Sequence, residues 1–122
     1  MQQRKQLSTE EIVRHRQGFI DHVPHDMPEG DKGRMTQAVH RSLDALQAGD
    51  GNTALSAIQE LLAIVEKHPE AGRGEPGLGH NLWAQYWSGC GNDCGLGGIG
   101  GSVTNAGVYA VCYWSCVAAY SF

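Results

Sequence analysis

Four cysteines form the most distinctive chemical pattern of this 122-residue chain, because they fall into two pairs with the same spacing. Three residues separate Cys90 from Cys94, and three separate Cys112 from Cys116. Residues four apart lie on one face of a helix. Two such pairs on antiparallel helices can form two nested disulfides, Cys90 with Cys116 and Cys94 with Cys112. Such bridges stabilise a small core by about 2–4 kcal/mol each.

Two other uses of the same thiols stay open at this stage. Zinc accepts four thiolates from closely spaced pairs, although no Lys or Arg follows Arg73 to offset the charge of such a site. Dedicated enzymes also join cysteine sulfur to dehydrated Ser or Thr, or to a backbone carbon, as a thioether. The segment offers these hydroxyl side chains: Ser88, Ser102, Thr104, Ser115 and Ser121. Disulfides are the favoured prediction, with thioethers and a four-cysteine zinc site as alternatives.

The six histidines do not form a recognisable catalytic or metal-binding motif. His22, His25 and Asp26 are close in the chain, but a proline between the histidines places them in a loop of unconstrained geometry. A pair such as His80 and Cys90 can activate a thiolate, yet no third residue or oxyanion site is identifiable. The chain has no P-loop, no His-Glu-x-x-His and no dinucleotide fingerprint after a predicted strand. We therefore expect that the chain has no enzymatic activity and binds no cofactor.

The first 75 residues predict three helices that form a small bundle. Ser8 and Glu11 make a capping box that begins a helix of about 8–22. The next helices are expected at about 31–48 and 53–68, with Asn52 as the N-cap of the last. Their apolar residues recur at helical spacing: Ile12, Val13, Phe19, Ile20; Met35, Val39, Leu43, Leu46; Leu55, Ile58, Leu62, Val65. So short a bundle buries little surface and is marginal alone.

The cysteines lie beyond a linker rich in glycine, residues 71–79. A short helix is expected within residues 80–90, with Leu82, Trp83, Tyr86 and Trp87 on one face, and the glycine-rich run 95–101 is the expected turn of a C-terminal hairpin. The predicted fold class is therefore mainly α: a three-helix domain over 1–75, a Gly-rich linker, and a cysteine-stapled hairpin within 76–122.

Charge divides the chain at the same place. Residues 1–75 hold all nine basic residues and twelve of the thirteen acidic ones, whereas Asp93 is the single charged residue of 76–122. A formal net charge of −4 excludes general nucleic-acid binding by phosphate neutralisation. The uncharged stretch 94–122 is long enough to span a bilayer, although its glycines are poor helix formers. Aromatic residues bracket the glycine-rich part at both ends, as in segments that contact the lipid–water interface: Trp83, Tyr86, Trp87, Tyr113, Trp114 and Tyr120.

A charged helical front, a Gly/Pro linker and a short Gly-, Cys- and aromatic-rich end together resemble a precursor of a bacteriocin or another ribosomally made, post-translationally modified peptide. The twin cysteine spacing also resembles disulfide-stapled helical hairpins of unrelated small proteins. The resemblance implies a leader that binds a modification enzyme or an exporter and protease. It also implies a core that is cut free, secreted and directed at a target membrane as an antimicrobial.

Many such leaders end in Gly-Gly, but the Gly-Gly pairs of this chain follow the first cysteine pair. Cleavage is therefore expected between Arg73 and His80, with Arg73, Gly77 and Gly79 as the processing region. No apolar run of a secretory signal follows the polar N-terminus. We accordingly expect a cytoplasmic precursor whose core leaves by a dedicated route. The alternative is a small non-enzymatic interaction or structural module with disulfides or zinc.

Overall fold

The computed structural model describes residues 6–69, 71, 83–95 and 105–121, and these contain six helices and no strand. The helices are α1 (Thr9–Arg14), α2 (Arg16–Asp21), α3 (Glu29–Gln47), α4 (Gly51–Lys67), α5 (Trp83–Asp93) and α6 (Ala106–Ser121). The predicted mainly α fold class is confirmed. The boundary expected at residues 75 and 76, most of the linker and most of the 95–101 turn lie outside the described residues.

The capping box at the start of α1 is confirmed. The Glu11 amide donates to Ser8 Oγ at 3.1 Å, and the Ser8 amide donates to Glu11 Oε1 at 3.0 Å. The single helix expected over 8–22 is wrong, however, because the chain is interrupted at His15. The His15 amide turns back to the Ile12 carbonyl three residues earlier. Tertiary contacts accompany this break, since Arg16 at the start of α2 bonds to His40 and Asp44 of α3.

The turn between α3 and α4 ends one helix and begins the next. Gly49 adopts a left-handed backbone with φ of 77°, and the amides of Gly49 and Asp50 bond to Leu46 and Ala45 in a Schellman arrangement. Asp50 then caps α4 by accepting from the Thr53 amide and hydroxyl. These bonds lower the pKa of Asp50. The expected cap at Asn52 is wrong, because the Asp50 carboxylate starts α4 two residues earlier. Helix α3 likewise begins at Glu29, earlier than expected.

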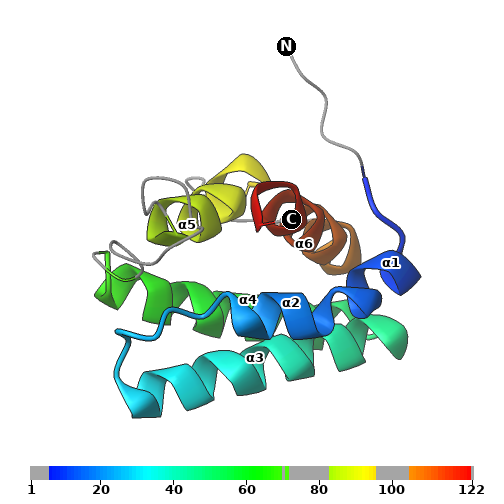
Figure 1. The fold of residues 1–122 in the computed structure, drawn as a ribbon. Coiled ribbons are helices and arrows are strands. Elements are labelled where there is room, and N and C mark those ends of the chain that lie inside the picture. Colours follow the sequence, from blue (N-terminus) through cyan, green and yellow to red (C-terminus); the bar gives the residue numbers. More distant parts are fainter. Residues whose placement is uncertain (1–5, 70, 72–82, 96–104, 122) are drawn as a thin grey trace.

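One continuous hydrophobic core joins all six helices. In Figure 1, α5 and α6 form the upper layer, α3 forms the lower layer, and α4 runs between them. The predicted apolar stripes of α3 and α4 face this core, with Met35, Val39, Leu43, Ile58 and Val65 almost completely buried. None of the described helices is both long and apolar enough to cross a membrane.

Candidate functional site: the stapled hairpin and its seat

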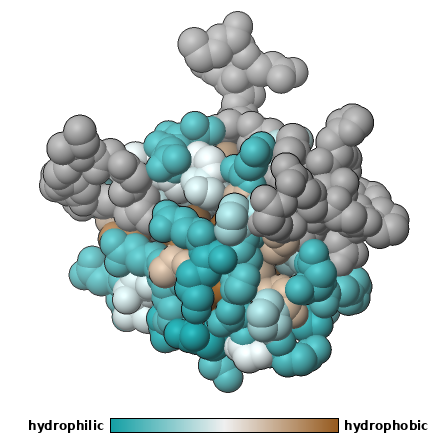
Figure 2. Space-filling view, turned by 90° about the vertical axis from the view of Figure 1, so that its left-hand side faces the viewer, coloured by the Kyte–Doolittle hydropathy of each residue, from teal (hydrophilic) through white to brown (hydrophobic). Residues whose placement is uncertain are grey.

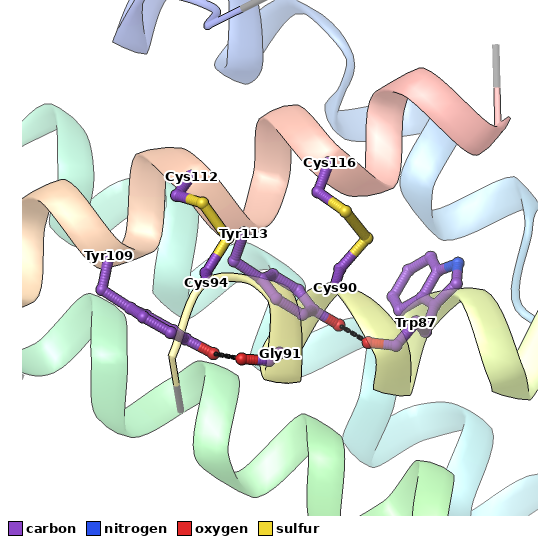
Figure 3. The surroundings of a disulfide bond; sticks show 8 residues. All are labelled: Trp87, Cys90, Gly91, Cys94, Tyr109, Cys112, Tyr113 and Cys116. Carbon is purple, nitrogen blue, oxygen red and sulfur yellow. Dashed lines mark hydrogen bonds between the residues drawn. A yellow bond between two sulfur atoms is a disulfide. The ribbon is translucent and has the colours of Figure 1, made fainter. Parts of the chain in front are cut away.

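Helices α5 and α6, here called the hairpin, are cross-linked by both disulfides (Figure 3). Cys90 pairs with Cys116 at a Cα–Cα distance of 5.6 Å, and Cys94 pairs with Cys112 at 6.0 Å. The nested pairing predicted from the spacing is confirmed. The first bridge is buried in the core, and the second is half-buried. The four cysteines of the chain are all used, so no disulfide joins the hairpin to α1–α4.

Disulfide formation removes the thiolates that a four-cysteine zinc site or a thioether would need. Within the described ranges, no group of three or more His, Cys, Asp or Glu side chains is placed to hold a metal ion. His22, His25 and Asp26 are among those residues, and His22 Nδ1 instead bonds to the Gly18 carbonyl at 2.8 Å. His80 lies outside the described residues.

Two tyrosines add a second set of links between α6 and α5 (Figure 3). Tyr113 donates its hydroxyl to the Trp87 carbonyl at 3.0 Å, and Tyr109 donates to the Gly91 carbonyl at 3.3 Å. Burial raises the pKa of both phenols, so they stay protonated donors. Sequence analysis missed the role of Tyr109. Its signal was the same four-residue spacing to Tyr113 that the cysteines show.

Trp114 holds the hairpin to α3 through a buried chain of hydrogen bonds. Its Nε1 donates to Ser42 Oγ at 2.9 Å, and Ser42 Oγ donates to the Ala54 carbonyl at 3.1 Å. Both Trp114 and Ser42 have no exposed surface. The Phe19 ring of α2 lies 4.6 Å from the Trp114 ring, and Trp87 meets Trp114 edge-on at 6.0 Å. Ser42 was not predicted, although a serine within the apolar stripe of α3 was its visible signal.

Glycines allow α4 to approach both helices of the hairpin closely. A Cβ built on Gly51 would lie 2.6 Å from the Gly107 nitrogen and 2.9 Å from its Cα, so backbone meets backbone at the starts of α4 and α6. A Cβ on Gly91 of α5 would lie 2.8 Å from Leu62 Cδ1 of α4. Only glycine leaves room at Gly51 without a backbone shift, since real Cβ contacts are longer than these distances.

A further contact comes from the residue before the α1 cap, because the Leu7 amide donates to Ser115 Oγ at 2.9 Å. Five of the residues that meet the hairpin, from α2–α4 and from the segment before α1, are here called the seat: Leu7, Phe19, Ser42, Gly51 and Leu62. The seat carries no charge, and its members come from four separate segments of the chain. Sequence reasoning could not assemble it, because no local pattern brings these residues together.

The rings predicted to contact a membrane face protein in this structure. Trp83, Trp87, Tyr113 and Trp114 are at most 2% exposed, and Tyr86 is half-buried. The Tyr120 side chain lies outside the described residues, as do Arg73, Gly77 and Gly79 of the predicted processing region. Membrane contact by these rings therefore requires the hairpin to leave its seat, and it stays a prediction.

Charged side chains cluster away from the seat, where α3 begins and α4 ends. His68 Nε2 lies 2.6 Å from Asp31 Oδ2, and Arg34 and Lys67 reach the other oxygen at 3.5 and 3.9 Å. The hydrogen bond from His68 is the main cause that lowers the pKa of Asp31. This cluster fastens α3 to α4 and contacts neither disulfide.

Comparisons with protein-family models, with curated protein sequences and with solved structures found no match to this chain.

Proposed function

We propose that the chain is a precursor whose hairpin is released as a membrane-active antimicrobial peptide, while α1–α4 cover its aromatic face until release. One observation carries the proposal: both disulfides close within residues 90–116, and neither reaches α1–α4. A single cut between Ala71 and Trp83 would free a doubly cross-linked hairpin with its covalent structure complete.

The chemistry of the hairpin supports the same role. Asp93 is its one charged residue, and it lies exposed at the end of α5. Once the hairpin leaves its seat, Trp87, Tyr113 and Trp114 lose part of their apolar cover, and large exposed apolar patches mark interaction surfaces. Trp and Tyr rings favour the lipid–water interface. Figure 2 shows one face of the molecule, on which hydrophilic residues predominate with smaller hydrophobic patches between them.

The N-terminal part would then bind the modification enzyme or the exporter and protease, as a leader does. The proposed role involves no catalysis and no cofactor by the chain itself. The precursor would be cytoplasmic, and the thiols would oxidise on export, because disulfides persist in oxidising compartments.

Dye leakage from anionic liposomes tests the proposal. A site-specific protease sequence is inserted between Gly74 and Glu75, and the oxidised chain is cut. The hairpin is then separated in urea without reductant, so that its bridges stay intact. We expect leakage and growth inhibition at micromolar hairpin and none from the uncut chain. The matched control is the same hairpin with its bridges reduced and alkylated. Absence of both effects would refute the proposal.

A small non-enzymatic interaction or structural module is the second candidate. It is favoured by the buried link from Trp114 through Ser42 to Ala54, which ties the hairpin into a shared core. The intact mass of the protein from its native producer discriminates between the two. A fragment near residues 80–122 lacking four hydrogens, which reduction restores, supports the precursor. The full chain alone supports the module.

A further inference from the structure

We infer that the seat on α1–α4 binds the hairpin as a non-covalent partner after the chain is cut. The N-terminal fragment is then a stoichiometric inhibitor of its own product, and it also captures hairpins released from other copies. This inference deepens the proposed function, and it rests on that function because it presumes a cut between the two parts.

Geometry makes the two parts separable but complementary. Because neither disulfide crosses from the hairpin to α1–α4, a cut leaves only non-covalent contacts between them. Those contacts come from every N-terminal helix or its flank. Among the described residues, the polar ones include Leu7 to Ser115 and Trp114 to Ser42. The apolar ones include the Phe19 ring on Trp114.

Separation would leave unsatisfied groups on both fragments. The Trp114 ring and the Phe19 ring have no exposed surface in the joined structure, and separation would remove the cover that each gives the other. A buried, satisfied hydrogen bond such as that from Trp114 to Ser42 also gives specificity, because a partner without the donor leaves Ser42 with one bond fewer. The two surfaces are therefore built for each other and not for general apolar contact.

The contact between Gly51 and Gly107 provides the most specific test of how closely the two parts pack. A Cβ on Gly51 would meet backbone atoms of Gly107 at 2.6 and 2.9 Å, and backbone cannot swing aside as a side chain does. The reverse substitution is not equivalent. A Cβ on Gly107 would meet Asn105 Oδ1 at 3.5 Å and Gly51 Cα at 3.9 Å, which are ordinary contacts. The same pair of residues therefore contains both a disruptive and a tolerated position.

The lack of charge on the five seat residues separates their contacts from binding driven by ion pairs. The seat residues are uncharged, and the polar contacts are between amide, indole and hydroxyl groups. Screening by salt therefore has little to act on. We expect the affinity of the fragments to be nearly constant between low and high salt.

The test uses the oxidised full chain with the protease sequence between Gly74 and Glu75, cut and left undivided. All three tryptophans and all four tyrosines lie at or beyond Trp83, so their fluorescence reports the hairpin alone. We expect both fragments to co-elute in size-exclusion chromatography at micromolar concentration, with tryptophan emission unchanged by the cut. An isotope-labelled hairpin added in excess should exchange into the complex.

Two matched glycine substitutions test whether the hairpin binds at the seat. Gly51→Ala should weaken the complex by about tenfold or more, whereas Gly107→Ala should bind within about threefold of the unmodified chain. Gly33→Ala is the control for helix propensity, since a Cβ there meets nothing within 4 Å. Because alanine favours helices over glycine, Gly51→Ala should keep the N-terminal helices folded, and far-ultraviolet circular dichroism checks this.

Elution of the unmodified fragments as separate species would overturn the inference, as would equal affinities of the Gly51→Ala and Gly107→Ala complexes. Neither measurement involves a membrane. Binding without leakage or growth inhibition by the separated hairpin would refute the proposed function and support the partnership. Leakage without binding would refute the partnership alone.

Discussion

Replacing Ser42 by alanine tests whether the buried link to Trp114 stabilises the shared core. The variant removes the acceptor of Trp114 Nε1, whose residue has no exposed surface. Leaving a buried donor unsatisfied costs about 1–3 kcal/mol. Alanine returns a few tenths of a kcal/mol, roughly, in helix propensity. We therefore expect the free energy of unfolding to fall by about 1–2 kcal/mol.

The assay is urea unfolding of the oxidised chain, followed by tryptophan emission and by circular dichroism at the same time. Coincident transitions in the two signals justify a two-state free energy. Ser56→Ala on the exposed face of α4 is the matched control, because it makes the same chemical change without a buried partner. Its effect should stay within about 0.5 kcal/mol of zero.

A double-mutant cycle with Trp114→Phe isolates the hydrogen bond from the other consequences of each change. In the phenylalanine background the donor is already absent, so Ser42→Ala should destabilise the chain less than it does alone. The reasoning is refuted if Ser42→Ala and Ser56→Ala have the same effect, or if the cycle shows no coupling. Either result would mean that apolar packing alone holds Trp114.

Three further predictions concern the bridges, the charged cluster and α5. Mild reduction should open the half-buried Cys94–Cys112 bridge before the buried bridge, because the attacking thiolate must reach a sulfur; alkylation and mass mapping check the order, and the reverse order contradicts it. The pKa of Asp31 in the folded chain lies below its ordinary value of 3.8. Its carboxylate therefore adds stability at pH values above the unfolded pKa, and this stability is lost as the pH falls below 3.8 through the folded pKa. In His68→Ala the pKa of Asp31 should rise, as carboxyl NMR titration would show, and an unchanged pKa would rule out the hydrogen bond as its main cause. Gly89→Ala places a Cβ with nothing within 4 Å, and it should stabilise the chain by about 0.5–1 kcal/mol in thermal unfolding. Gly91→Ala should not give this stabilisation, because its Cβ would meet Leu62 of α4. Equal stabilities of the two variants would contradict the close approach of α4 and α5.

Local signals predicted much of the fold. The Ser8–Glu11 capping box and the apolar stripes of α3 and α4 each depend on residues within a few positions, so the sequence contains the whole interaction. The pairing of the cysteines was also predictable, because the spacing of four places each pair on one helix face. These features give the mainly α class and the stapled hairpin.

Local signals failed where a distant partner or a competing cap decides. The interruption at His15 goes with bonds from Arg16 to α3, which no pattern within residues 8–22 contains. The N-cap of α4 is Asp50 and not Asn52 two residues later, because two good capping residues stand close together and the Asp50 carboxylate is the one that accepts from Thr53. The seat could not be predicted either, because its residues meet partners that are distant in the sequence.

By itself, the sequence determined that an uncharged, doubly cross-linkable C-terminal segment follows a charged helical one, because composition and spacing are properties of the chain alone. The tertiary structure decided which surface covers that segment. Leu7, Phe19, Ser42, Gly51 and Leu62 meet the hairpin only after four segments have packed. The aromatic rings, which composition alone assigned to a membrane, are buried against protein because that packing removes more of their apolar surface from water than the hairpin alone does.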